Sequence, residues 1–156
     1  IAYAPNEAKV TLLQVADEPG VAAEIFGPLA DAAVNVDMIV QNMSADGKTT
    51  DVTFTVSTDE LERALAVIEG LKGKVEFANL QAVPEMAKIS VVGVGMRSHA
   101  GVAQKMFKEL AEKGINIHVI STSEIKVSVL IDSDYAELAV RALHAAYGLD
   151  DETIDA

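Results

Sequence analysis

Residues 34–57 read VNVDMIVQNMSADGKTTDVTFTVS, and their pattern of apolar and polar residues is the clearest indication of the fold. Residues 35–43 alternate apolar with polar side chains, and residues 51–57 do so again, which is the pattern of half-buried strands. The tripeptide Asp-Gly-Lys at 46–48 stands between them and predicts a tight turn. The stretch therefore predicts an antiparallel hairpin.

One strand and one helix are expected on each side of this hairpin. Residues 9–15 (KVTLLQV) are apolar and β-branched, which predicts a strand. Residues 21–33 and 61–71 carry apolar side chains at helical spacing, which predicts two amphipathic helices. Residues 74–83 read as a fourth strand. The order β-α-β-β-α-β is the split ferredoxin-like arrangement, an α+β fold in which we expect helices on one face of an antiparallel sheet.

The same order returns from Lys88, so the chain contains an internal repeat. The tripeptide GVA occurs at 20–22 and at 101–103, and VNV at 34–36 corresponds to INI at 115–117. Two ferredoxin-like units in tandem are therefore expected.

The repeat also predicts the domain limits. We expect a first unit over residues 6–84, a second unit over 85–149 and an acidic tail over 150–156. The second copy lacks its fourth strand, whereas the chain before the first copy has no place in that copy. Residues 1–5 are therefore expected to fold back as the missing edge strand of the second unit.

Composition excludes several classes of function. The 156 residues include 24 acidic and 12 basic side chains, for a net charge of −12. Nucleic acids and anionic membranes attract basic surfaces, so neither is an expected partner. The absence of Cys excludes disulfides and thiol chemistry, and no apolar run approaches the ~20 residues of a membrane span. We expect a cytoplasmic protein.

The sequence contains no complete motif for catalysis or for cofactor binding. Residues 47–49 (GKT) resemble the end of a phosphate-binding loop, but position 42 is Asn where glycine is required and a strand follows. Residues 93–95 (GVG) begin a dinucleotide fingerprint whose third glycine is replaced by Ser98. The three histidines share no metal-ligand spacing. We therefore expect no cofactor, no metal site and no catalytic centre in this chain.

Two helix starts remain as candidate ligand sites. The segments at 17–22 (DEPGVA) and 97–102 (RSHAGV) lead into helix starts, whose free N–H groups bind a carboxylate well. Asn35 and Asn116 open the neighbouring strands, where backbone C=O and N–H groups suit a zwitterionic amino acid. The alternative is that the glycines of these segments only permit close packing of helix on sheet.

Several long strings resemble the regulatory part of aspartate kinases. VQNMS at 40–44 and TTDVTFT at 49–55 resemble the first ACT unit of that family. VVGVGMRSHAGVA at 91–103 resembles the start of the second unit, and ISTSEIKVSVLI at 120–131 resembles its hairpin. The resemblance extends to about Tyr147 and implies tandem ACT domains, as a separate β subunit or a C-terminal regulatory part.

The family implies a function for such a chain. Aspartate kinases phosphorylate aspartate with ATP on the way to lysine, threonine, methionine and diaminopimelate, and end products bind the regulatory part. The resemblance implies an allosteric domain that binds threonine and/or lysine for feedback inhibition. Its expected partners are a second copy, in a homodimer, and the catalytic subunit or domain. The alternatives are a free-standing ACT-repeat sensor or dimerisation module for another enzyme and, third, a small enzyme on this fold.

The resemblance also implies two effector sites, each where the first unit of one chain meets the second unit of another. The first would use Asp17, Pro19, Gly20, Val21, Ala22, Asn35, Val36 and Gln41, with Thr122, Ser123 and Glu124 on the far wall. The second would use Met96, Ser98, His99, Gly101, Asn116 and Ile117, with Ser44 and Thr53 on the opposing strands. Because position 99 is not acidic, we expect different ligands, with threonine at the first site and lysine at the second.

Overall fold

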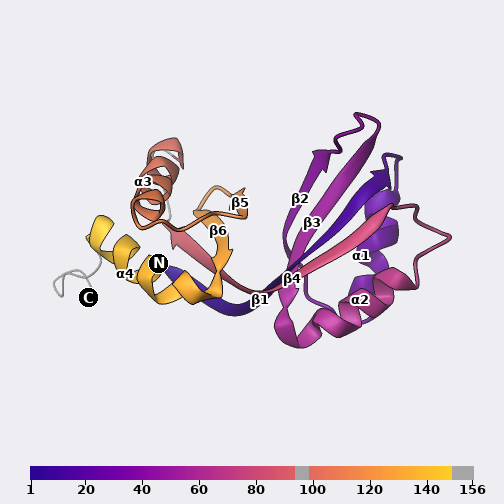
Figure 1. Ribbon diagram of the computed structural model, residues 1–156, viewed down its shortest axis with the longest axis horizontal. Coiled ribbons are helices and arrows are strands. Elements are labelled where there is room, and N and C mark those ends of the chain that lie inside the picture. The colour runs from indigo at the N-terminus through magenta and orange to yellow at the C-terminus, as the bar shows by residue number, and fades with distance from the viewer. Residues whose placement is uncertain (94–98, 149–156) are drawn as a thin grey trace. The chain divides into compact units, whose positions relative to one another are not determined.

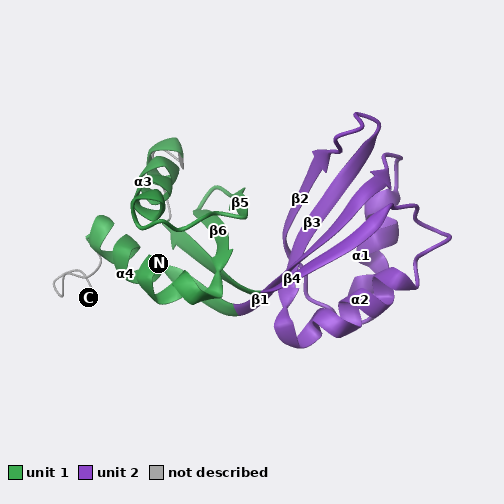
Figure 2. Ribbon diagram, viewed as in Figure 1, with its two compact units in different colours: residues 1–5, 85–156 green, residues 6–84 purple. Residues whose placement is uncertain are grey.

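The computed structural model describes residues 1–93 and 99–148, and of His99 it describes the backbone alone. The chain divides into two compact units (Figure 2). Residues 6–84 form one unit, and residues 1–5 together with the chain from Glu85 onward form the other. The acidic tail expected at 150–156 lies outside the described residues.

The 6–84 unit has the predicted β-α-β-β-α-β order. Its strands follow the sheet order β2-β3-β1-β4, and β3 pairs antiparallel with both β1 and β2. A 3₁₀ turn, η1, leads into the second helix. The elements are β1 (Ala2–Ala16), α1 (Val21–Asp31), β2 (Asp37–Met43), β3 (Thr49–Ser57), η1 (Thr58–Glu60), α2 (Leu61–Glu69) and the start of β4 (Asn79–Val92).

The other unit repeats this plan with strands from both ends of the chain. In the sheet order β1-β4-β6-β5, β6 pairs antiparallel with β4 and β5. Residues 1–5 of β1 belong to this unit, and Ile1 packs against its core. The remaining elements are α3 (His99–Glu112), β5 (Val119–Thr122), β6 (Lys126–Asp132), η2 (Ser133–Tyr135) and α4 (Ala136–Ala146).

The core of the 6–84 unit lies between one sheet face and the helices α1 and α2, which cover that face (Figure 1). Alternate residues of β1 and β3 point into it, as the period-two pattern requires. Phe54 is fully buried at its centre, and its ring meets Phe26 edge-on with the centroids 5.4 Å apart. The other fully buried side chains of this core include Val10, Leu12, Ile25, Leu29, Ala64 and Ile68.

Strand β4 differs from the expectation for residues 74–83. Lys74 and Val75 donate their N–H groups to the carbonyl of Leu71 at 2.9 and 3.0 Å, so the chain after α2 forms turns before it extends at Asn79. Beyond that point the strand continues through Pro84 to Val92. The join between the repeats is therefore the middle of a strand.

Strands β1 and β4 change units at the same local motif. Asn6 and Glu85 both have positive φ, at 62° and 63°, and each follows a proline. Positive φ is uncommon for such residues, and proline has no N–H for a sheet ladder. Each strand is therefore irregular where it leaves one unit for the other.

The fifth strand is also shorter than expected from residues 115–121. The Ile115 N–H is donated to the Leu110 carbonyl at 2.9 Å, which extends the end of α3 into a turn, and regular pairing begins only at Val119.

Among the described residues, the helices are too short or too polar to cross a membrane.

Two bulges interrupt the ladders of the 6–84 unit. The β1–β3 register shifts between Leu12 and Val15, and the β2–β3 register shifts between Asp37 and Val40. Inside these bulges Gln14 and Met38 have φ of 56° and 48°.

Candidate functional site

One hollow of the 6–84 unit brings together two residues of the expected first site, Asp17 and Gln41. Asp17 comes from the loop between β1 and α1, and Gln41 from β2. The hollow has a volume of about 320 Å³. The end of β2 and the β2–β3 turn supply the rest of its lining, which is Asn42, Met43, Gly47, Lys48, Thr49 and Thr50.

The hairpin turn beside this hollow is organised by one carboxylate. Asp46 Oδ1 accepts the N–H groups of Lys48 at 2.8 Å and Thr49 at 3.0 Å, and Oδ2 accepts the Thr49 hydroxyl at 2.9 Å. Gly47 supplies the left-handed backbone that the turn needs, with φ of 71°. The backbone N–H groups of Lys48 and Thr49 hold the pKa of Asp46 below its usual value. The turn that carries Lys48 is therefore fixed by the ionised form of Asp46.

The hollow presents opposite charges to a ligand. The Asp17 carboxylate suits an ammonium, the Lys48 ammonium suits a carboxylate, and the Gln41 amide can donate and accept hydrogen bonds. Lys48 is not among the expected site residues, because the sequence predicts a turn at residues 46–48 and excludes a phosphate-binding loop at 47–49. The arrangement fits a small zwitterion.

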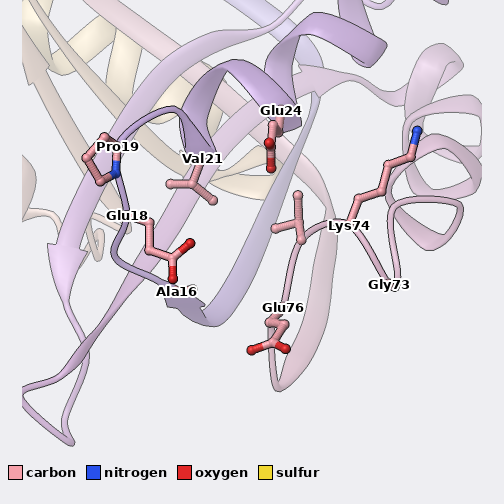
Figure 3. A pocket seen from close by; sticks show the side chains of 9 residues that line it. Ala16, Glu18, Pro19, Val21, Glu24, Gly73, Lys74 and Glu76 are labelled. Atoms are coloured by element: carbon pink, nitrogen blue, oxygen red, sulfur yellow. The ribbon is translucent and has the colours of Figure 1, made fainter.

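A second hollow holds other residues of the expected first site, Pro19 and Val21. It has a volume of about 240 Å³ and lies between the loop before α1 and the loop between α2 and β4. Figure 3 shows Lys74 extending away from Glu18 and Glu76. The lining contains three carboxylates, those of Glu18, Glu24 and Glu76, and their negative charge would repel a ligand carboxylate at the start of α1. The lining is Ala16, Glu18, Pro19, Val21, Glu24 and residues 73–76.

A third hollow, of about 350 Å³, contains Asn35 and Val36. The Asn35 N–H, which the sequence suggested for a ligand carboxylate, is donated to Glu60 Oε1 at 3.1 Å. Glu60 Oε2 in turn pairs with Arg63 at 3.2 Å. The rest of the lining is Glu7, Asp37, Thr55, Val56, Ser57 and Glu60.

The hydroxyls of Ser44 and Thr53 are engaged inside the 6–84 unit. Ser44 is 5% exposed and donates its hydroxyl to Asp51 Oδ1 at 2.6 Å. The Thr53 hydroxyl lies 3.0 Å from the hydroxyl of Thr11. Gly20 and Ala22 are exposed at the start of α1 and line none of the three hollows.

The residues expected from the second repeat lie at the ends of its elements. Gly101 is in the first turn of α3, Asn116 is exposed before β5, and Ile117 packs against the core. Thr122 ends β5. Ser123 and Glu124 lie in the turn that follows, where the Ser123 N–H is donated to the Lys126 carbonyl at 2.8 Å. Met96, Ser98 and the side chain of His99 lie outside the described residues.

The histidine side chains in the described part of the chain do not form a metal-binding cluster. His118 Nε2 lies 3.1 Å from Asp132 Oδ1. Within residues 1–93 and 100–148, no three His, Asp or Glu side chains gather in a way that could hold a metal ion.

The chain matches the ACT domain family model over residues 13–70 and 89–147. It is 54% identical over 150 residues to an aspartate kinase of Stutzerimonas stutzeri and 43% identical over 154 residues to an aspartokinase of Corynebacterium glutamicum. These alignments cover 96% and 97% of this chain but only 36% of each relative.

Two solved structures match nearly end to end. A structure of aspartokinase alpha and beta subunits has a TM-score of 0.85 at 48% identity, covering 94% of this chain and 96% of the matched chain. The ligand-free regulatory subunit of the Thermus thermophilus aspartate kinase has a TM-score of 0.84 at 38% identity, covering 94% and 95%. This chain therefore belongs to the ACT domain family, and it corresponds to the regulatory part of aspartate kinases.

Proposed function

We propose that this chain is an amino-acid sensor that controls an aspartate kinase by feedback, with threonine and/or lysine as effectors. The observation that carries the proposal is the hollow in which Asp17, Gln41 and Lys48 meet. It offers a partner for each end of a zwitterion, and its volume of about 320 Å³ suits a small ligand.

The effector acts by linkage between two arrangements of an assembly. A ligand that binds one arrangement more tightly shifts the population toward it, and such couplings are typically ~1–3 kcal/mol. In this proposal the sites are completed by a second copy, whose Thr122–Glu124 turn forms the far wall of the first site. The chain is therefore a homodimer when it binds its effectors.

The edge strands support self-association. Strand β2 lies at one edge of the strand order and exposes Ile39 by 54% and Met43 by 74%, and β5 lies at the other edge and exposes Ile120 by 46%. Exposed apolar side chains on an edge strand, which is paired on one side only, are favourable places for another chain to bind. These surfaces suit the side-by-side joining of sheets from two copies.

The catalytic step belongs to the remainder of the enzyme in this proposal. The relatives whose regulatory part matches this chain are aspartate kinases, and the match spans 36% of their length. Phosphorylation of aspartate by ATP then takes place in a catalytic domain or subunit, in the cytoplasm. This chain reports the level of end products to it.

Binding can be tested directly. The melting temperature of the chain is measured with each of the 20 amino acids, and each amino acid that raises it is titrated by calorimetry. A ligand that binds only the folded state raises the free energy of unfolding by ~2.7 kcal/mol when its concentration is a hundredfold above its Kd. We expect threonine or lysine to raise the melting temperature, and a chain that responds to neither contradicts the proposal.

Matched substitutions locate the site. Gln41→Ala removes an exposed amide from the hollow and is expected to weaken binding, whereas Gln81→Ala removes an exposed amide from β4 and is expected to leave it unchanged. Equal Kd values for the two variants would place the effector elsewhere.

A further inference from the structure

One carboxylate oxygen in the 6–84 unit accepts two hydrogen bonds from segments far apart in the sequence. Asp51 Oδ1 lies 2.6 Å from the Ser44 hydroxyl oxygen and 3.0 Å from the backbone nitrogen of Gln14. Hydrogen bonds to an ionised carboxylate are shorter and stronger than those between neutral groups. Asp51 on β3 therefore ties the end of β1 to the residue that follows β2.

The bond to Gln14 holds an irregular backbone. Gln14 has φ of 56° and lies in the β1 bulge, where the register against β3 shifts between Leu12 and Val15. A bulge takes a residue out of the hydrogen-bond ladder of the sheet. A non-glycine residue keeps a positive φ only where its surroundings stabilise that backbone conformation. The N–H that the ladder loses at Gln14 is accepted by Asp51.

The bulge lies immediately before one wall of the Asp17 hollow. After it, Val15 and Ala16 pair with Thr50 and Thr49, and Asp17 follows directly in the chain. The bulge therefore decides where β1 ends and the Asp17 loop begins.

The bond to Ser44 lies beside the opposite wall. Ser44 follows Met43, the last residue of β2, and its N–H is donated to the Thr49 carbonyl at 2.9 Å. Gln41, Asn42 and Met43 line the hollow from this strand. Asp51 itself is not part of the lining.

We propose that Asp51 is a positioning residue for effector binding. Its carboxylate fixes the position of the Asp17 loop relative to the end of β2. The affinity for the effector depends on this relative position, although Asp51 does not contact the ligand. The inference rests on the proposed function and identifies the residue that shapes its site.

Two substitutions at this position separate positioning from charge. Asp51→Asn keeps an Oδ1 that can accept both hydrogen bonds, whereas Asp51→Ala removes both. We expect Asp51→Ala to weaken threonine or lysine binding about tenfold, and Asp51→Asn to stay within about threefold of the wild type. Asp59→Ala, an exposed carboxylate in η1, is the charge-matched control and is expected to bind as the wild type does.

Backbone exchange supplies a second readout at the bulge itself. In the 156-residue chain, the Gln14 amide is expected to exchange with solvent faster in Asp51→Ala than in Asp51→Asn, while the amides of β6 exchange equally in both. Affinities are compared by calorimetry under conditions where each variant is folded by circular dichroism. If Asp51→Ala does not fold, Ser44→Ala removes one of the two bonds, and we expect about threefold weaker binding.

The outcomes distinguish the inference from the function on which it rests. A wild-type chain that binds neither threonine nor lysine overturns the proposed function, and the positioning role with it. A wild-type chain that binds, beside an Asp51→Ala variant (or Ser44→Ala in its place) with the same Kd, overturns the positioning role alone. Equal losses in Asp51→Ala and Asp51→Asn also overturn it, because charge and not hydrogen bonding is then responsible.

Discussion

Replacing Thr55 by valine is expected to stabilise the protein, although it removes a polar group from the middle of a strand. The Thr55 side chain is 0% exposed, and its Oγ1 has no hydrogen-bond partner among the described residues. A buried polar group without a partner costs about 1–3 kcal/mol. Valine has the same shape and leaves no cavity, so Thr55→Val is expected to raise the free energy of unfolding by an amount in this range.

Thr53 on the same strand is the matched control. Its hydroxyl lies 3.0 Å from that of Thr11, so Thr53→Val removes a formed hydrogen bond and is expected to lower stability by about 0.5–1.5 kcal/mol. The same chemical change two residues apart should thus have opposite signs.

Urea denaturation followed by circular dichroism measures both effects, because the chain has no Trp for fluorescence. The midpoint is expected to move while the slope stays constant, which identifies a change in stability and not in the extent of unfolding. A Thr55→Val variant less stable than the wild type would contradict this prediction, since the hydroxyl must then have a partner in solution.

Three further perturbations test other parts of the molecule. Phe54→Ala should lower the free energy of unfolding by about 3–5 kcal/mol, because Phe54 is fully buried against Phe26. Met43→Ala at an exposed edge should change it by less than about 0.5 kcal/mol. Denaturation curves of the two variants measure both effects. Deleting residues 1–5 should speed amide exchange in β4 and β6, because the unit loses its Ile1 packing; unchanged exchange there would contradict the placement of these residues. Folding depresses the pKa of Asp46, so its stabilising effect is present above its ordinary pKa of 3.8 and is lost as the pH falls through the folded value. The stability difference between wild type and Asp46→Asn should therefore shrink on acidification below pH 3.8, and a constant difference would exclude this contribution.

The order of helices and strands was predictable because the apolar residues of each repeat recur at the regular spacing of a strand or of a helix. Val52, Phe54 and Val56 alternate with polar residues, and the helices show one apolar stripe each, so the β-α-β-β-α-β order is confirmed. The irregular points were not predictable. Gln14 and Met38 adopt positive φ, yet neither residue type signals it. The unit limit expected after residue 84 falls inside a strand, because β4 continues to Val92.

The candidate site was predictable only in part for a related reason. Asp17 and Gln41 were expected together and line one hollow, but Asn35 and Pro19 line two others. Sequence motifs give the segments that approach each other, whereas the hydrogen bonds within them decide which groups remain for a ligand. The Asn35 N–H, donated to Glu60, is the clearest case.

The passage of β1 and β4 from one unit into the other means that the second repeat is not a self-contained module, because its unit includes residues 1–5 from before the first repeat. A fragment of residues 85–148 would lack residues 1–5 and leave an edge of β4 unpaired, which invites pairing with other chains and aggregation. Cutting the gene at the sequence repeat would therefore damage the second half. Recombination that exchanges regulators between enzymes would preserve the second unit only if residues 1–5 were transferred along with both repeats.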